Sequence, residues 1–461
     1  MTFSAVKYGV EPEEERADIK LLCEEYQKYN YIDPNAFERY SVKRGLRNAD
    51  GTGVMAGITN ICNVHGYIMD EGEKKPIDGE LIYRGIDVET LINGCERDNR
   101  FGFEETVWLL LFGNLPTAAQ LEHFSGLLAS MRELPDTFTE DMILKAPSPD
   151  IMNKLARSVL ALYSYDENPD DTSLENIIRQ AVELVARMPT IMVSAYQVKR
   201  RFYDHKSMYF HPPKARHSIA ETILYTMRSN KNFTAEEAHL LDKCMILHAE
   251  HGGGNNSTFA TRVLTSSGTD TYSAIAAGIG SLKGPLHGGA NAKVMQMLNF
   301  IKDNVQNYNN DDEVASYLEK LVRKQAGDLS GKIFGMGHAV YTKSDPRARI
   351  LKNSAMKLAE NTEFIDDFKL LEAVERLTPQ VLSAVRNEER VICANVDLYS
   401  GMVYKMLSIP PEMFTPLFAC SRIGGWCAHR VEEMITGGRI IRPAYKAISQ
   451  SLNYVPLAER A

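Results

Sequence analysis

Three histidines flanked by glycines are the residues of this 461-residue sequence best suited to chemistry. His251 precedes three glycines, His287 follows Gly284-Pro-Leu, and His338 follows Gly335-Met-Gly. Glycine destabilises regular structure, so its clustering indicates a backbone that turns sharply or approaches a ligand closely. We therefore expect a site at these turns, where imidazole groups donate hydrogen bonds or transfer protons.

His248 and His251 stand three residues apart, and this spacing leaves other interpretations open. His248 falls on the apolar face of a predicted helix, where a histidine is more often a core residue than a functional one. The pair could instead bind zinc in a hydrolase, with His287, His338 or Asp397 as a further ligand. We expect no metal, because the sequence contains no His-Glu-x-x-His motif. A helical scaffold without catalytic activity is the remaining interpretation.

His287 and Asp397 both lie near predicted helix starts. An apolar period resumes over residues 290–298, so His287 would lie near the positive end of a helix dipole, which favours the neutral ring. A neutral imidazole can donate a hydrogen bond to a carbonyl group. Asp397 could act as a buried base, or it could cap a helix over residues 398–407.

Helical patterns predict the elements that must position these residues. We expect an all-α fold, with a surface helix over residues 12–29 and short strands only between Gly45 and Gly85. A further helix should end at Pro189, since proline disrupts helix interiors. Other helices are predicted from the capping boxes Thr117-Ala-Ala-Gln120 and Thr234-Ala-Glu-Glu237, and from apolar spacing over residues 151–162 and 174–188.

Composition limits the class of protein. A chain of 461 residues exceeds one ordinary core, so we expect two domains. The formal net charge of −8 disfavours nucleic acid as a partner. The longest apolar run, residues 107–112, is far shorter than the ~20 residues of a membrane span. Seven cysteines without Cys-x-x-Cys spacing, and an acidic start without an apolar segment, predict a cytoplasmic protein.

Four segments that carry these residues resemble the active-site segments of citrate synthases, in the same order. The similarity extends to residues 79–85, 110–117 and 421–426, and covers nearly all of the chain after about residue 45. The four segments are His-x-x-His-Gly-Gly-Gly-Asn-Asn-Ser-Thr (248–258), Gly-Pro-Leu-His-Gly-Gly-Ala-Asn (284–291), Gly-Met-Gly-His-Ala-Val-Tyr-x-x-x-Asp-Pro-Arg (335–347) and Asn-Val-Asp-x-Tyr-Ser-Gly (395–401).

The resemblance implies a fold and an activity. The expected fold has a large helical domain (residues 1–287 and 399–461), a small helical domain (288–398) and an active site in the cleft between them. The expected enzyme is an acyltransferase of the tricarboxylic acid cycle that condenses acetyl-CoA with oxaloacetate and hydrolyses the thioester to citrate and coenzyme A. The alternative is 2-methylcitrate synthase, which uses propionyl-CoA. No cofactor is implied, since acetyl-CoA is a substrate.

The resemblance also implies residue roles and a homodimer. His287 would polarise the thioester carbonyl, Asp397 would remove the methyl proton, and His338 would polarise the ketone of oxaloacetate. Arg442 would reach the site from the partner subunit. The implied oxaloacetate ligands are His251, His338, Arg347, Arg422 and Arg442, and the implied coenzyme A contacts are Gly335, Gly337, Ala339, Lys343, Arg390 and Asn395.

Overall fold

A computed structural model describes residues 12–48, 50–71, 73–360, 362–387 and 391–460 of the chain. The chain forms two compact units, Met1–Met55 with Pro443–Ala461, and Ala56–Arg442. All of the predicted site residues belong to the second unit. The expected boundary between a large and a small domain falls inside that unit, and it stays a prediction.

The described part of the first unit is short and mostly exposed. It contains α1 (Pro12–Tyr29), α2 (Ala36–Arg39) and two single turns, Arg44–Leu46 and Leu457–Glu459. The range predicted for the first helix is confirmed, and its side chains from Ala17 onward are exposed.

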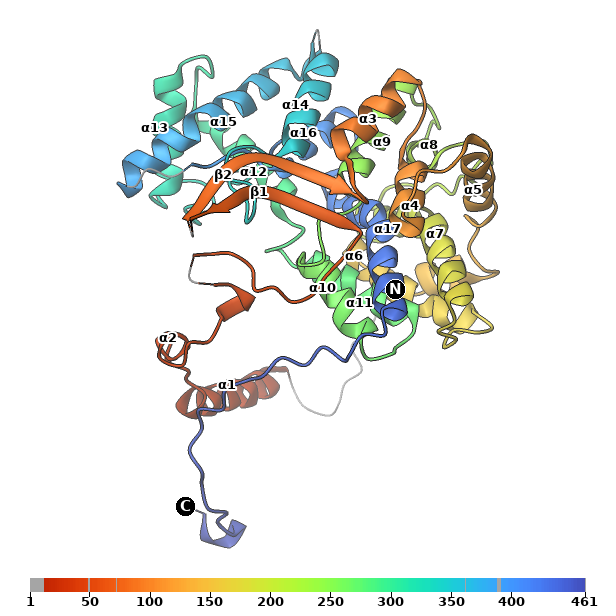
Figure 1. The fold of residues 1–461 in the computed structure, drawn as a ribbon. Helices are drawn as coiled ribbons and strands as arrows, with labels where there is room; N and C mark the ends of the chain where they lie inside the picture. The colour runs from red at the N-terminus through yellow and green to blue at the C-terminus, as the bar shows by residue number, and fades with distance from the viewer. Residues whose placement is uncertain (1–11, 49, 72, 361, 388–390, 461) are drawn as a thin grey trace. The chain divides into compact units, whose positions relative to one another are not determined.

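The second unit is helical, which confirms the predicted all-α class (Figure 1). In the part of the chain that the structure describes, no helix is both long and apolar enough to cross a bilayer. The helices are α3 (Val88–Arg97), α4 (Phe103–Phe112), α5 (Ala118–Ser130), α6 (Ile151–Leu162), α7 (Leu174–Phe202), α8 (Ile219–Met227), α9 (Ala235–His248), α10 (Asn256–Thr265), α11 (Thr271–Lys283), α12 (Ala290–Asn304), α13 (Asp311–Val322), α14 (Pro346–Ala359), α15 (Ile365–Arg386), α16 (Val396–Met406) and α17 (Phe414–Ile435).

Two helices begin at the predicted capping boxes. Thr117 accepts the backbone N–H of Gln120 at the start of α5, and Thr234 accepts that of Glu237 at the start of α9. In each box the glutamine or glutamate side chain accepts the N–H of its threonine in return. These contacts satisfy backbone donors that a helix start would leave unpaired.

The prediction that a helix ends at Pro189 is wrong. α7 continues through Pro189 to Phe202. Proline removes one backbone donor and crowds the preceding turn. Residues on both sides of it, including Met188 and Ile191, are completely buried. Packing of this central helix against its neighbours therefore outweighs the local cost of the proline.

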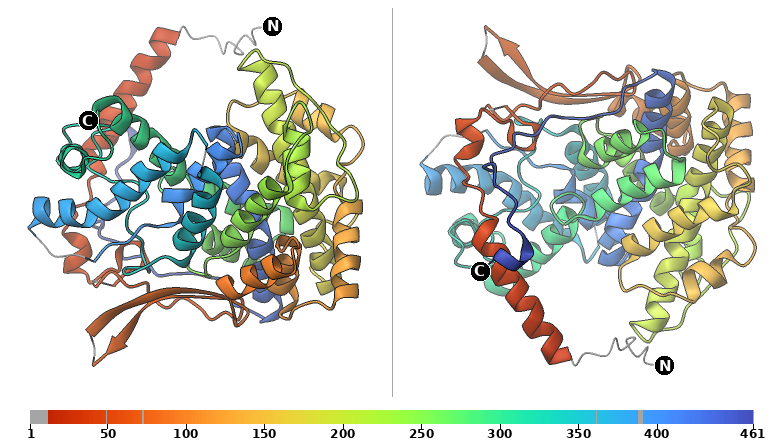
Figure 2. Two further views of the ribbon diagram at one scale, coloured as in Figure 1. Left: turned by 90° about the horizontal axis from the view of Figure 1, so that it is seen from above. Right: turned by 90° about the horizontal axis from the view of Figure 1, so that it is seen from below.

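The expected strands form a small antiparallel sheet. β1 (Cys62–Asp70) and β2 (Glu73–Tyr83) make a long hairpin, and β3 (Ile86–Asp87) pairs with the end of β2. The turn end of the hairpin extends beyond the helices of this unit (Figure 2). The ladder pairs His65 with Glu80 but next pairs Tyr67 with Pro76, so the register shifts between these pairs.

α17 is the central helix for the site. It packs against α4, α7, α9, α10 and α11, and most of its residues are buried. Gly425 lets α17 approach the end of α9 closely, because a Cβ atom there would lie 2.4 Å from the carbonyl oxygen of Ala249, just after α9. The crossing brings side chains of α17 against the segment between His248 and His251.

The segment from α12 to α16 carries the other site residues. α14 and α12 both pack against α16, and α13 packs against α15. The loop that contains His338 lies just before α14, while Asp397 lies in the first turn of α16. The packing of α14 on α16 therefore positions these two residues.

Candidate active site

His338 is held in one orientation by its own loop. The backbone N–H groups of Val340 and Tyr341 donate to His338 Nδ1, at 3.0 and 3.1 Å. A backbone N–H can only donate, so Nδ1 accepts and the ring proton of the neutral imidazole lies on Nε2. His338 is thereby prepared to donate a hydrogen bond from Nε2.

Tyr341 is the centre of a group of rings and charges. The ring of His338 stacks on that of Tyr341 with centroids 4.7 Å apart, and the ring of His251 lies 5.1 Å from His338 and 5.5 Å from Tyr341. The guanidinium carbon of Arg347 lies 5.6 Å from the centre of the Tyr341 ring. The structure thus brings together three predicted oxaloacetate ligands, His251, His338 and Arg347.

Arg347 is buried and oriented by Asp345. Its Nε and Nη2 atoms donate to the two carboxylate oxygens at 3.0 and 2.8 Å. Burial opposes the charge of Arg347, but the Asp345 carboxylate raises its pKa above the usual value. The same carboxylate accepts the backbone N–H of Val396 at 3.2 Å. Asp345 therefore links Arg347 to the start of α16.

Arg422 is a buried cation with free donors. Its Nε atom donates to the carbonyl oxygen of His248 at 2.7 Å, and its guanidinium carbon lies 4.7 Å from the centre of the Phe418 ring. Both terminal nitrogen atoms are buried and have no hydrogen-bond partner among the described residues. Burial lowers the pKa of Arg422 from its usual value. The charge of Glu250 opposes this shift. Buried donors without a hydrogen-bond partner are nevertheless costly, so the two terminal nitrogen atoms are suited to an anionic ligand.

His248 and His251 are neutral at pH 7. Burial lowers the pKa of His251 well below its usual value, and the charge of Arg347 lowers it further. Burial, with Arg347, also lowers the pKa of His248 to about 3. The Nδ1–H of His248 donates to the carbonyl oxygen of Cys244 at 2.8 Å, as in a core histidine. Within the described chain, the Nε2 atom of each ring is buried without a partner.

The ring of His287 is held by Ser257 of α10. The backbone N–H of Ser257 donates to His287 Nε2 at 3.3 Å, which places the ring proton on Nδ1. The Ser257 hydroxyl lies 3.1 Å from the same nitrogen and accepts the indole N–H of Trp426 at 3.2 Å. Burial and then the charge of Arg422 lower the pKa of His287 to about 4. The ring is therefore neutral, as expected, although burial is the main cause and α12 begins three residues later.

Asp397 does not cap its helix. α16 begins at Val396, and Asn395 is its cap, since Asn395 Oδ1 accepts the backbone N–H of Asp397 at 2.9 Å. The capping alternative is therefore wrong, and the Asp397 carboxylate is not used for this purpose. Burial raises the pKa of Asp397 to about 6, while the charge of Arg347 lowers it and that of Asp345 raises it.

The glycines before His338 allow a tight contact with α16. Gly335 and Gly337 have φ angles of +81° and +88°, which favour glycine. A Cβ atom at Gly335 would lie 2.8 Å from the Cα atom of Leu398. The side-chain amide of Asn395 donates to the carbonyl oxygen of Gly337 at 2.8 Å. Asn395, a predicted coenzyme A contact, thus joins the His338 loop to α16.

The other predicted residues lie outside this group. The Lys343 ammonium pairs with Asp78 at 2.8 Å, and both side chains are exposed. Ala339 is exposed, and Arg390 lies outside the described residues. Arg442 is exposed, and within the described chain no hydrogen bond or ion pair joins it to the other candidates. The dimeric role predicted for Arg442 stays a prediction.

A buried pair next to His251 was missed by the sequence analysis. His429 Nε2 lies 3.2 Å from Glu250 Oε1, and this oxygen also accepts the backbone N–H of His251 at 2.8 Å. Arg262 Nε donates to His429 Nδ1 at 2.9 Å. Two signals could have revealed the pair: Glu250 directly precedes His251, and His429 follows Arg422 by seven residues, which places both on one face of a helix.

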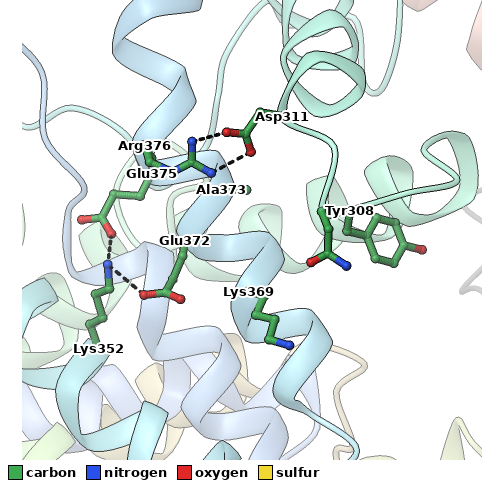
Figure 3. Close-up of a pocket in the computed structure, with 9 residues that line it drawn as sticks. Tyr308, Asp311, Lys352, Lys369, Glu372, Ala373, Glu375 and Arg376 are labelled. Atoms are coloured by element: carbon green, nitrogen blue, oxygen red, sulfur yellow. Dashed lines mark hydrogen bonds and ion pairs between the residues drawn. The ribbon is translucent and has the colours of Figure 1, made fainter.

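A surface cavity of about 520 Å³ lies apart from these residues (Figure 3). Most of its charged side chains pair with one another: Lys352 with Glu372 and Glu375, and Arg376 with Asp311. None of the predicted site residues lines it.

No group of three or more His, Cys, Asp or Glu among the described residues is arranged to hold a metal ion.

Comparison with known proteins identifies relatives of the whole second unit. Residues 48–444 match the family model described as citrate synthase, C-terminal domain. A citrate synthase of Synechocystis sp. is 35% identical over 83% of this chain and 89% of its own length. A 2-methylcitrate synthase of Shewanella oneidensis is 32% identical over 82% of this chain and 92% of its own. A solved Thermoplasma acidophilum citrate synthase, a ternary complex with carboxymethyl coenzyme A and oxaloacetate, superposes with a TM-score of 0.74 at 27% identity, covering 91% of this chain and 99% of that one.

Proposed function

The chain belongs to the citrate synthase family and is an acyltransferase of that type, and on this basis we propose that it condenses acetyl-CoA with oxaloacetate and hydrolyses the product to citrate and coenzyme A. The main observation in support is the set of buried hydrogen-bond donors around Tyr341 and α17. Arg422 Nη1 and Nη2 are buried without a hydrogen-bond partner in the described chain, and the charge of Arg422 lowers the pKa of both His248 and His251. Such donors suit a small, doubly charged, planar ligand such as oxaloacetate.

Oxaloacetate would bind first to the two buried arginines. Arg422 offers both terminal nitrogen atoms to one carboxylate, and Arg347, oriented by Asp345, contacts the other. Arg442 of the partner subunit would complete the second contact in a homodimer. The ketone would accept a hydrogen bond from His338 Nε2, which carries the ring proton. His251 would contact the same substrate from the side.

Acetyl-CoA would be activated by Asp397 and His287. The Asp397 carboxylate removes a methyl proton, while His287 Nδ1–H donates to the thioester oxygen on which negative charge develops. A pKa of about 6 leaves Asp397 ionised at pH 7, yet makes it a stronger base than an exposed aspartate. The neutral His287 stabilises the enolate without first losing a proton.

The carbon–carbon bond forms between the two substrates. The enolate carbon attacks the keto carbon of oxaloacetate, and the keto oxygen takes up one proton through His338 Nε2 to become the new hydroxyl group. This proton balances the one that Asp397 removed from the methyl group. The product, citryl-CoA, is then hydrolysed, so that water cleaves the C–S bond and the thiol of coenzyme A leaves. We propose no cofactor, since imidazole groups polarise both carbonyls.

Coenzyme A would be held largely by backbone near Gly335 and Gly337. This segment lies at the start of α16: the Gly337 N–H donates to the carbonyl oxygen of Cys393, and the carbonyl oxygen of Gly335 accepts the Asn395 N–H, both at 2.8 Å. Ala339, Lys343, Arg390 and Asn395 remain proposed contacts on the basis of the family resemblance. Lys343 would have to leave Asp78 to reach a phosphate group.

A thiol-release assay with purified protein, oxaloacetate and acetyl-CoA tests the proposal. Thiol should appear at a rate that depends on both substrates, with citrate as the product. The same assay with propionyl-CoA tests the alternative, because relatives of both types match the chain with similar identity. One methylene in an apolar pocket is worth only ~1–3 kcal/mol of discrimination. A higher kcat/KM for propionyl-CoA would replace our assignment with 2-methylcitrate synthesis.

A further inference from the structure

The β1–β2 hairpin is interrupted in the middle of its ladder. Pairing runs from Cys62 with Tyr83 to His65 with Glu80, and resumes at Tyr67 with Pro76. The shift leaves Gly66 on one strand and residues 77–79 on the other outside the register. A glycine inside a strand often marks a bulge or a place where another backbone approaches closely.

The residues left out of the register contact the loop of His338. The backbone N–H of Gly79 donates to Ser344 Oγ at 3.0 Å, and this hydroxyl donates to Asp78 at 3.1 Å. Close by, the hydroxyl of Tyr341 donates to the carbonyl oxygen of Glu80 at 3.3 Å. The interruption therefore turns hydrogen-bonding groups of the hairpin towards residues 338–344.

Both glycines are required by the closeness of this contact. A Cβ atom at Gly66 would lie 2.8 Å from the carbonyl oxygen of Val340 and 3.0 Å from the Cα atom of Tyr341. A Cβ atom at Gly79 would lie 2.2 Å from the carbonyl oxygen of Ser344. These distances fall at or below the limit for non-bonded atoms, so any larger residue would displace the backbone of the loop.

Gly66 acts on the peptide group that orients His338. The N–H of the peptide between Val340 and Tyr341 donates to His338 Nδ1 at 3.1 Å, and its carbonyl oxygen faces Gly66. In a trans peptide the C=O and the N–H point in opposite directions. Moving the carbonyl side of this group therefore also moves the donor that fixes the tautomer of His338.

The base of the hairpin is anchored to the other histidine segment. The hydroxyl of Tyr83, at the end of β2, lies 3.0 Å from the carbonyl oxygen of Ile246 and 3.1 Å from that of Glu250. Val64 of β1 faces Gly252, with 3.3 Å from its methyl group to a Cβ atom placed on that glycine. One element thus contacts both the segment of His251 and the loop of His338.

We propose that Gly66 and Gly79 are positioning residues for His338, and that the interrupted hairpin holds the 338–344 loop so that Nε2–H faces the ketone of oxaloacetate. The inference rests on the proposed function for the role of His338. The contact between hairpin and loop can be measured without reference to that function.

The test compares Gly66→Ala and Gly79→Ala with Gly126→Ala. Gly126 lies in α5, and a Cβ atom there has no heavy atom within 4 Å, so this variant is a matched control. The two hairpin variants should raise the KM for oxaloacetate and lower kcat/KM by on the order of 10²-fold. The KM for the acyl-CoA should change much less. The control should behave as wild type in every assay.

Hydrogen exchange provides the readout that does not depend on activity. Backbone amides of residues 338–344 should exchange at least about tenfold faster in both hairpin variants, while those of α9 should keep their wild-type protection. Folded hairpin variants with wild-type exchange in this loop and wild-type KM would overturn the proposal. If wild type itself releases no thiol, the proposed function fails, yet the exchange result still decides whether the hairpin holds the loop.

Two milder variants keep the test valid if a glycine variant does not fold. Ser344→Ala removes the acceptor of the Gly79 N–H, and Tyr341→Phe removes the hydrogen bond to Glu80 while keeping the ring beside His338. Each variant should raise the KM for oxaloacetate and the exchange rate of the amides of residues 338–344. The factors should be smaller than for the two glycine variants. Wild-type values for both variants would contradict the proposal.

Discussion

Asp345 holds Arg347 through both carboxylate oxygens, with Nε 3.0 Å from Oδ1 and Nη2 2.8 Å from Oδ2. The same group accepts the N–H of Val396, which directly precedes Asp397. One buried carboxylate therefore orients a proposed substrate ligand and adjusts the electrostatic potential at the proposed base.

Asp345→Asn should shift the pH dependence of catalysis. The charge of Asp345 raises the pKa of Asp397. Its removal lowers that pKa, so the acid limb of the kcat/KM profile should move below its wild-type position near pH 6. The KM for oxaloacetate should rise about tenfold, because Arg347 loses its bidentate partner. Asp311→Asn breaks a remote surface pair with Arg376 and serves as the control. An acid limb that stays in place would contradict the electrostatic link.

Asp397→Asn should remove the base and keep the shape of the side chain. We expect kcat for condensation to fall by roughly 10²–10⁴. Hydrolysis of supplied citryl-CoA should decrease less, since no methyl proton is removed in that step. Near-normal condensation in a protein with a wild-type circular dichroism spectrum would exclude Asp397 as the base.

The same substitution should stabilise the protein at neutral pH. The pKa of Asp397 is raised from 3.8 in the unfolded chain to about 6 in the fold, so ionisation costs the native state stability. This cost begins near pH 4 and is complete above pH 6. The Tm of Asp397→Asn should therefore exceed that of wild type at pH 7, and the difference should shrink towards zero at pH 4. A constant difference would indicate another cause.

Glu250→Gln should change stability at neutral pH in the opposite direction, by lowering it. Burial alone would raise the pKa of Glu250, but His429, Arg422 and hydrogen bonds lower it from 4.5 to about 2. The stability that its charge contributes is present above pH 4.5 and is lost as the pH falls towards 2. Glu250→Gln should therefore be clearly less stable than wild type at pH 7, with a difference that narrows under acid conditions. Denaturant unfolding at several pH values measures this trend.

A mixture of two inactive variants should recover activity if Arg442 acts across a dimer. Homodimers of His287→Ala or of Arg442→Ala each carry a lesion in both sites. A heterodimer would combine one site that carries both lesions with one intact site, so equal mixing should restore about a quarter of wild-type activity. Verified subunit exchange without recovery would show that Arg442 serves its own chain or has no role.

Sequence patterns correctly predicted the helices that have strong local signals. The capping boxes of α5 and α9 are complete within four residues, so no tertiary information was needed. Pro189 misled the prediction because its cost is local, whereas the packing that offsets it involves distant helices.

The candidate site residues stay a prediction, and their geometry could not be predicted from the sequence. Neither the bidentate hold of Asp345 on Arg347 nor the contact of Glu250 with His429 on α17 could be inferred from spacing alone, since each depends on side-chain orientation or on a helix crossing. The roles of Gly66 and Gly79 were hidden for another reason. A glycine in the sequence does not show which atoms lie close to it, and here those atoms belong to a loop far along the sequence.

The hairpin and the 338–344 loop are also synthesised at very different times. Gly79 and its partner Ser344 are separated by 265 residues, so the ribosome completes the hairpin long before the loop exists. At about 5–20 residues per second, the interval is roughly 13 to 53 s. Until residue 344 has been synthesised, water is the only partner available to the Gly79 N–H in place of Ser344, and the proposed orientation of His338 cannot form.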